Sequence, residues 1–233
     1  MSSIHTVFDL LAVTASLLVT VCFYHWRLKD AAQRISTVGF GYGLALVLGT
    51  AIGGYGFGTL NLWLSHDVGI GRSIVGSLAG GICAIEIFKW MSGIMGSTGI
   101  IFVPAFAATV AVGRWGCFLS GLDDHTYGVA TTLPWGKDFG DGILRHPVQL
   151  YESFSMLAFL IFASAMIGRR SPWFMRNGFY VLVLFYSAQR FVWEFLKPYG
   201  AVLGPLNLFH LVCVGLAGYA IWMMRGQHGR AVA

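Results

Sequence analysis

The sequence predicts an all-α integral membrane protein, with about seven transmembrane helices in one bundle. Hydrophobic residues make up 56% of the 233 residues and charged residues only 11%, whereas roughly 25% of an ordinary soluble domain is charged. The mean hydropathy is +0.69. Because each spanning helix needs about 20 apolar residues, the chain has room for these spans and little else. We therefore expect residues 1–233 to form a single transmembrane domain.

The expected spans are long apolar stretches separated by short polar connections. No Lys or Arg precedes Arg27, so the first span lacks the charged start of a signal peptide and is expected to be a retained helix. The second and third spans are rich in glycine at spacings that favour close helix packing. The spans are Val7–Trp26, Val38–Leu64, Gly69–Trp90, Gly99–Gly113, Pro147–Ile167, Asn177–Leu196 and Leu206–Met224.

The distribution of Lys and Arg among the connections predicts the orientation in the membrane, because cytoplasmic loops carry the excess. The connections richer in basic residues contain Arg27, Lys29, Arg34, Lys89, Arg169, Arg170, Arg176, Arg225 and Arg230. The poorer set contains Arg72, Arg114, Lys137, Arg145 and Lys197. We therefore expect a periplasmic N-terminus, a cytoplasmic C-terminus and one sizeable outward-facing loop, at about residues 114–146.

Composition also excludes some functions. The isoelectric point is near 9.2, yet the basic residues are scattered between apolar spans and form no patch of the kind that binds nucleic acid. Cysteines stand far apart along the chain, at Cys22, Cys83, Cys117 and Cys213. Such spacing is typical neither of a disulfide framework nor of a metal knuckle. We expect no disulfide, no metal and no nucleic-acid partner.

Charged residues inside apolar spans need partners or a polar cavity, because burying them in lipid is costly. Arg190 and Glu194 are four residues apart, so they lie on one helix face and can pair directly. The pair is either a structural one or a device by which Glu194 orients Arg190 toward an anion. Arg114 is expected near the outer leaflet, where a guanidinium suits a lipid phosphate, although simple snorkelling is the alternative. Two such arginines meeting one phosphate would form a headgroup clamp.

Several motifs together resemble one family. The segments that carry the resemblance are Gly113-Arg114-Trp115-Gly116-Cys117-Phe118, Gly128, Pro134-Trp135, Arg145-His146-Pro147-Val148-Gln149-Leu150-Tyr151-Glu152, and Tyr186 with Arg190-Phe191-Val192-Trp193-Glu194-Phe195. In order and spacing they resemble the prolipoprotein diacylglyceryl transferase family. The likeness extends over most of the chain, and the family's seven helices with an outward N-terminus agree with the topology above.

The resemblance implies an enzyme of the inner (plasma) membrane with its active site toward the periplasm. Such an enzyme transfers the diacylglyceryl group of phosphatidylglycerol to the lipobox cysteine thiol of a prolipoprotein, and glycerol phosphate leaves. The family's essential arginines fall on Arg114 and Arg190, which would hold the phosphate and offset charge on the leaving group. That role needs no metal or organic cofactor. A different lipid or a small molecule stays open as the acceptor.

The resemblance also implies a wider set of substrate-binding residues around the two arginines. These are Gly113, Gly116, Cys117, Ser120, Gly128, Arg145, His146, Gln149, Tyr151, Glu152, Tyr186 and Glu194. Gln149 and Glu152 are expected either to bind glycerol hydroxyls or to cap the loop.

The chain departs from the family pattern at five positions. Cys117 and Ser120 take the places of two asparagines, Val75 stands where a histidine assigned as a base is usual, and Lys197 and Ala51 replace arginines. These departures indicate a divergent member.

The lost histidine leaves the general base open. Asp123 and Asp124 beside His125 place a carboxylate next to an imidazole in the outward loop, a plausible base, although a solvated polar loop explains these residues equally well. His146 is a second candidate. Cys117 is either a nucleophile or a small packed residue.

Two other classes of function stay open. The first is a non-catalytic lipid-binding membrane subunit, or a small transporter that uses Arg190 and Glu194 in a polar pathway. The second is a haem or quinone protein, which is disfavoured because only His210 lies well inside a later span.

Overall fold

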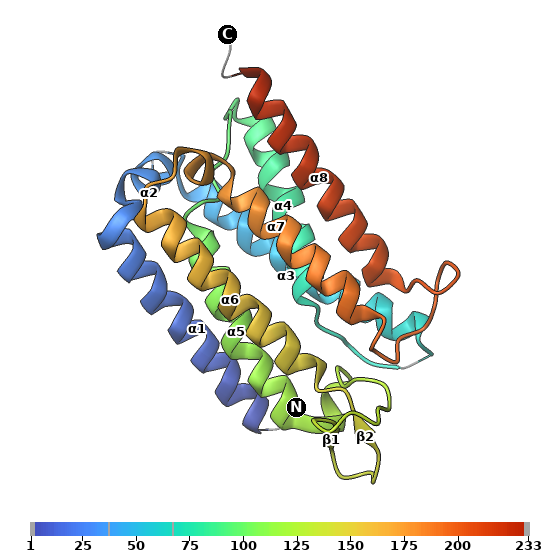
Figure 1. Cartoon of the computed structure of the whole chain (residues 1–233). Coiled ribbons are helices and arrows are strands. Elements are labelled where there is room, and N and C mark those ends of the chain that lie inside the picture. The colour runs from blue at the N-terminus through green and yellow to red at the C-terminus, as the bar shows by residue number, and fades with distance from the viewer. Residues whose placement is uncertain (1–2, 37, 67, 231–233) are drawn as a thin grey trace. The chain divides into compact units, whose positions relative to one another are not determined.

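The computed structural model describes residues 3–36, 38–66 and 68–230 of the chain. This part of the chain is helical apart from a two-stranded ribbon and its loops, so the predicted all-α class is confirmed (Figure 1). The long helices are α1 (Ser3–Phe23), α3 (Phe40–Leu64), α4 (Ile74–Met91), α5 (Phe102–Ser120), α6 (Val148–Gly168), α7 (Pro172–Glu194) and α8 (Leu208–Arg230). The short elements are η1 (Tyr24–Leu28), α2 (Lys29–Ser36), η2 (Gly121–Asp124), β1 (Lys137–Asp138) and β2 (Leu144–Arg145).

Within the described residues, 6 helical segments are long and apolar enough to cross a membrane. They are Ile4–Gln33, Phe40–Leu64, Ile74–Met91, Phe102–Asp124, Val148–Gly168 and Leu208–Gly226. The remaining expected span, Asn177–Leu196, corresponds to α7, a helix of 23 residues that is about 34 Å long at 1.5 Å per residue. α7 falls outside the apolar set because it carries polar residues such as Asn177, Arg190 and Glu194.

One boundary differs from the prediction in a way that matters for the site. The helix expected to end at Gly113 continues as α5 to Ser120, so Arg114 and Cys117 lie on a helix and the connecting loop begins later. A charged residue suggested an end to the apolar span. The helix continues past it because Trp115, Phe118 and Leu119 maintain an apolar surface and, as described below, the arginine charge is paired inside the protein.

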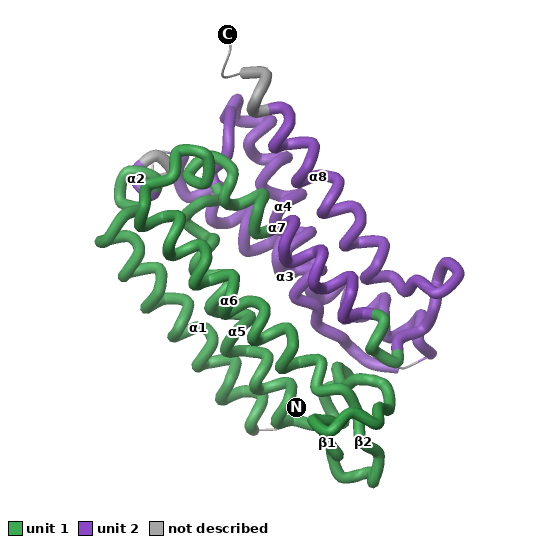
Figure 2. The backbone as a smooth tube through the Cα atoms, in the orientation of Figure 1, with its two compact units in different colours: residues 1–31, 99–182, 195–198 green, residues 32–98, 183–194, 199–233 purple. Residues whose placement is uncertain are grey.

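The chain forms two compact units (Figure 2). Unit 1 comprises Met1–Ala31, Gly99–Leu182 and Phe195–Pro198. Unit 2 comprises Ala32–Thr98, Val183–Glu194 and Tyr199–Ala233. α7 therefore begins in unit 1 and ends in unit 2.

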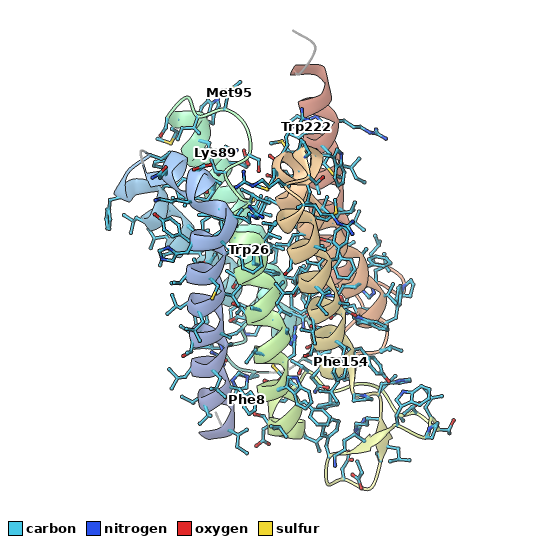
Figure 3. All side chains as sticks on the ribbon, turned by 60° about the vertical axis from the view of Figure 1, so that its left-hand side comes forward. Phe8, Trp26, Lys89, Met95, Phe154 and Trp222 are labelled. Carbon is cyan, nitrogen blue, oxygen red and sulfur yellow. The ribbon has the colours of Figure 1, made fainter. Side chains whose placement is uncertain are left out.

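Unit 1 is built on α5, which packs against both α1 and α6. Residues Val103, Ala107 and Val110 of α5 are completely buried, one helical turn after another. Gly116 lies against Phe8 of α1, where an added β-carbon would overlap the β-carbon of the phenylalanine. Figure 3 shows Phe8 on α1 and Trp26 further along the same helical run. The close contact of α1 with the end of α5 brings His5, at the start of α1, to Cys117 in the last turn of α5.

Unit 2 is built on α3 and α4, whose backbones touch through glycine. A β-carbon on Gly53 would overlap the backbone of Gly76 and Gly80, and one on Gly80 would overlap that of Gly49 and Gly53. Lipid supplies no hydrophobic driving force between helices, so van der Waals contact of this kind contributes much of their association. The glycine-rich spans therefore serve helix packing, as the sequence indicated.

Glu86 on α4 has the partners that a charged residue in an apolar span requires. The Lys89 ammonium lies 3.0 Å from its carboxylate, and the Tyr219 hydroxyl of α8 donates to it at 2.8 Å. This cluster links α4 to α8 within unit 2.

The α3–α4 contact predicts opposite effects for the same substitution at two glycines of α3. Gly53→Ala should lower the free energy of unfolding by about 1–3 kcal/mol, because overpacking forces two backbones apart. Gly56→Ala is the matched control, since nothing lies within 4 Å of its β-carbon position, and alanine favours helix over glycine by roughly 0.5–1 kcal/mol. Thermal unfolding in detergent, followed by circular dichroism, measures both. Equal stability of the two variants would contradict this packing.

Candidate functional site

The central feature of unit 1 is a buried set of three charged side chains on α5, on α6 and just beyond α7. The Arg114 Nε lies 2.5 Å from Glu152 Oε2, an ion pair without the alignment of a hydrogen bond. The Lys197 ammonium donates to the other oxygen of Glu152 at 2.8 Å. All three residues are at most 5% exposed. One carboxylate therefore serves two cations, and the set carries a net positive charge.

The pairing of α5 with α6 places this set. Ser153, next to Glu152, donates its hydroxyl to the carbonyl of Ala111 at 2.5 Å, which ties the two helices together one turn from Arg114. Taking charges out of water costs several kcal/mol per ion, and only close partners offset that cost. Since both oxygens of Glu152 contact cations, this residue orients Arg114 and Lys197.

Gln149 stands out because its side chain is buried and unsatisfied. It is 0% exposed on α6, and no described residue hydrogen-bonds its amide oxygen or nitrogen. Buried amides almost always have partners, so an exception calls for an explanation such as a bound ligand. Its position one turn from Ser153 places it near the charged set in sequence and along the helix.

The structure gives Asp124 a different partner from the one expected. Its Oδ1 lies 2.9 Å from Nε2 of His5, at the start of α1. His125 is exposed, has a left-handed backbone with φ 55°, and makes no ion pair with Asp124 in the described part of the chain. Asp124 thus pairs with His5 and not with His125 in the described residues, and the role of Asp124 and His125 as an acid–base pair stays a prediction. His5 was missed because no local spacing connects it to a carboxylate more than a hundred residues away.

Cys117 lies beside His5 and Asp124, and these three side chains form a second cluster in unit 1, besides the charged set of Arg114, Glu152 and Lys197. Its sulfur lies 3.8 Å from Nε2 of His5 and 3.8 Å from an Arg114 nitrogen. The cysteine is 8% exposed. The helix α5 thus presents Arg114 and Cys117, three residues apart, to partners on different elements.

The ribbon and the start of α6 hold the other residues expected in unit 1. Arg145 pairs with Asp141 at 2.6 Å, and its guanidinium lies 5.0 Å from the centroid of the Tyr127 ring. The hydrogen bond from Arg145 lowers the pKa of the Asp141 carboxyl. Arg145 thus has partners within its own loop.

His146 and Tyr151 lie next to one another. Nδ1 of His146 is 3.4 Å from the Tyr151 hydroxyl, which also accepts a hydrogen bond from the Trp135 indole at 2.8 Å. Gly128 lies so close to the backbone of His146 that a β-carbon would overlap it. These contacts explain the spacing of the motif residues in the loop.

Of the remaining α5 residues in the expected set, Gly113 and Gly116 lie against α1. A β-carbon on Gly113 would make ordinary contact with Ala12, whereas one on Gly116 would overlap Phe8. Ser120 is the last residue of α5. Contact with substrate stays a prediction for these three positions.

Unit 2 contains the other predicted arginine. Arg190 Nε lies 2.9 Å from Glu194 Oε2, so the predicted pair is confirmed. Glu194 also accepts from the Asn207 amide at 3.4 Å, and the Arg190 guanidinium lies 5.6 Å from the Phe209 ring centroid. Tyr186, one turn before Arg190, is completely buried. Glu194 thus holds Arg190 in one orientation.

The expected residues therefore form separate groups in the two units. Arg114, Cys117, Asp124 and Glu152 belong to unit 1, whereas Arg190 belongs to unit 2 with its glutamate and tyrosine. Convergence of the two arginines on one phosphate stays a prediction.

Comparison with known proteins decides the family. A model of the family described as prolipoprotein diacylglyceryl transferase matches residues 6–225. The chain belongs to this family. The matched range includes both arginines and at least most of every long helix. The chain is a multi-pass membrane protein.

Individual relatives agree with this assignment. The chain is 31% identical over 211 residues to the phosphatidylglycerol–prolipoprotein diacylglyceryl transferase of Nitratidesulfovibrio vulgaris strain DP4, covering 82% of this chain and 77% of the relative. It is 30% identical over 223 residues to that of Cupriavidus necator, covering 88% and 79%. It is 34% identical over 155 residues to that of Clostridioides difficile, covering 64% of this chain and 59% of the relative.

The buried charged set predicts a large stability effect for a small change of structure. Glu152→Gln keeps the shape of the side chain but leaves two buried cations without a counter-charge, which should lower the free energy of unfolding by about 3–5 kcal/mol. Denaturant unfolding in detergent measures it. Asp141→Asn, which breaks the exposed pair with Arg145, is the control and should change stability little. A Glu152→Gln variant as stable as the control would show that the buried pairing is not needed.

Proposed function

We propose that this chain transfers the diacylglyceryl group of phosphatidylglycerol to the cysteine thiol of a prolipoprotein. Family membership supports the reaction class, and the names of the relatives specify phosphatidylglycerol and a prolipoprotein. The observation that carries the proposal is the buried, net positive set of Arg114, Lys197 and Glu152 inside a membrane helix bundle. An apolar site with excess positive charge suits a lipid that has an anionic phosphate.

The reaction exchanges one bond at the glycerol backbone of the lipid. The acceptor sulfur loses its proton and forms a bond to the terminal glycerol carbon. The bond from that carbon to the phosphate oxygen breaks, and glycerol phosphate leaves with the electron pair. Negative charge grows on the leaving phosphate, so fixed cations beside it stabilise the transition state more than the ground state.

Arg114 and Arg190 are proposed to bind the phosphate. Each has its Nε against a carboxylate, Glu152 or Glu194 respectively, which restrains the guanidinium before substrate arrives. A guanidinium stays charged at every physiological pH and presents planar donors to phosphate oxygens. Preorganised donors of this kind cost no reorganisation during the reaction.

Gln149 is proposed to bind a hydroxyl of the glycerol headgroup. Its buried amide offers both a donor and an acceptor, and no described residue uses either. Glu152, the other candidate for this role, instead pairs with Arg114 and Lys197. Headgroup recognition on α6 would therefore come from the amide.

The active site is proposed to face the periplasm. The excess of Lys and Arg in the opposite set of connections supports this orientation. A site at the outer leaflet would receive phosphatidylglycerol laterally and a lipobox peptide held in the membrane by its own apolar segment. The proposed location is the inner (plasma) membrane.

A non-catalytic lipid-binding role is the second candidate function. It is favoured by Val75, a completely buried valine at the position where the family pattern has a histidine. A lipid-binding protein would retain the cations and the amide but would not transfer the lipid to a thiol.

Mass-tagged phosphatidylglycerol, offered with a lipobox peptide, separates these functions. The chain should move the tagged diacylglyceryl group to the cysteine, and Arg114→Ala and Arg190→Ala should each lower the rate about 10²–10³-fold. Arg169→Ala, at an exposed arginine, is the control and should retain the rate. Circular dichroism confirms that each variant is folded.

The same assay can also give the result that would contradict the proposed enzymatic function. If the folded chain retains tagged phosphatidylglycerol and transfers none of it to the peptide, the lipid-binding function replaces the transferase. A second acceptor arm, with a thiol-containing lipid and a small thiol, tests whether the chain uses a different acceptor.

A further inference from the structure

Three side chains of different chemistry converge at one end of unit 1. They are His5 at the start of α1, Cys117 in the last turn of α5, and Asp124 at the end of η2. The imidazole nitrogen, the sulfur and a carboxylate oxygen all lie within 4.8 Å of one another. The shortest separation is 2.9 Å, between His5 Nε2 and Asp124 Oδ1, and the sulfur is 3.8 Å from the same nitrogen.

This set of donors is selective for a class of metal. Zn²⁺ binds thiolate sulfur, imidazole nitrogen and carboxylate oxygen in tetrahedral sites. Thiolate and imidazole together disfavour the hard cations Mg²⁺ and Ca²⁺, which prefer oxygen. Three protein ligands leave the fourth tetrahedral position for another molecule, an arrangement typical of catalytic zinc.

Each of the three candidate ligands also contacts a further polar side chain. Asp9 Oδ2 lies 3.2 Å from Nδ1 of His5, so the carboxylate can accept a hydrogen bond from Nδ1–H, which leaves the lone pair on Nε2 for a metal. The Thr126 hydroxyl donates to the Asp124 carboxylate, and Arg114 lies 3.8 Å from the Cys117 sulfur. Outer partners of this kind orient metal ligands and raise their affinity.

We propose that His5, Cys117 and Asp124 bind Zn²⁺, and that the open fourth position takes the thiol of the acceptor. The second part rests on the proposed function. A metal-bound thiol is deprotonated outright, so the ion would supply the activated sulfur. The metal site would thus activate the thiol, a role that a base at the position of Val75 cannot fill because valine does not accept a proton. This differs from the expectation, drawn from cysteine spacing, that the chain binds no metal.

The position of Arg114 supports the role in transfer. Arg114 touches both clusters of unit 1, since it pairs with Glu152 and approaches the Cys117 sulfur. A sulfur on the metal and a phosphate on the guanidinium would therefore be neighbours. Before the acceptor binds, Zn²⁺, the Cys117 thiolate and the Asp124 carboxylate sum to zero charge. The ion thus offsets the charge of its own ligands, and Arg114 is not needed to neutralise Cys117.

The step conserves atoms and charge. The acceptor thiol gives its proton to water as its sulfur binds the metal. The sulfur then bonds to the terminal glycerol carbon, the bond from that carbon to the phosphate oxygen breaks, and the neutral thioether leaves the metal. Glycerol phosphate carries away the negative charge, and no oxidant or reductant is needed.

Cobalt reports on this site without any lipid substrate. Metal-free, untagged protein in detergent, titrated with Co²⁺, should develop a sulfur-to-cobalt charge-transfer band in the near ultraviolet and tetrahedral bands in the visible. Cys117→Ser should lose the charge-transfer band, and His5→Ala and Asp124→Asn should abolish tight binding. Asp9→Asn should weaken it about 10–100-fold, as loss of an outer partner does.

Two controls and two negative outcomes complete the test. Cys213→Ser removes a buried thiol of unit 2, and His125→Ala removes the neighbouring exposed imidazole; both should keep the wild-type spectrum. No charge-transfer band in the wild type, or the same band in Cys117→Ser, would overturn the metal site.

A thiol peptide tests the open position. A lipobox peptide added to the cobalt protein should intensify the charge-transfer band, whereas the same peptide with serine for cysteine should not. An unchanged spectrum with the thiol peptide, or undiminished transfer by metal-free protein, would overturn the thiol role while the proposed transferase stands. A different outcome would count against the transferase. In it, the cobalt-substituted protein gives the expected spectra, but the same protein loaded with Zn²⁺ transfers no diacylglyceryl group.

Discussion

The burial of Arg114 is the constraint around which unit 1 is organised. A guanidinium cannot lose its proton, so inside a membrane helix it must be paired. Glu152 supplies the charge, and its position on α6 requires that helix to lie beside α5 at this depth. Lys197 completes the set from a third segment. One buried charge thereby specifies the register of two helices and the position of a connection.

The two units hold their helices together by different means. In unit 2, α3 and α4 approach through glycine, so backbone meets backbone. In unit 1, α5 and α6 are joined by an ion pair and by the hydroxyl of Ser153. Both devices suit lipid, where apolar burial does little to favour association. The polar one has a further consequence, because it leaves charge and buried hydrogen-bonding groups available for a ligand.

The replacement of arginine by Lys197 keeps the positive charge but changes its geometry. An ammonium is a point charge without the planar fork of a guanidinium, so it pairs well with one carboxylate oxygen and recognises phosphate less specifically. We therefore expect the proposed phosphate recognition in unit 1 to depend on Arg114. Cys117, in place of an asparagine of the family pattern, changes the chemistry of the neighbouring position from amide to thiol.

Hydrophobic composition and periodicity determined the helices, because the need to satisfy backbone groups in lipid leaves a long apolar segment no other structure. The spacing of Arg190 and Glu194 likewise determined their pairing, since four residues is one helical turn. Only the tertiary structure decided the partners of Arg114 and Asp124. Those partners, Glu152 and His5, come from distant segments, and which side chains meet across helices depends on their rotation and depth, which local spacing does not encode.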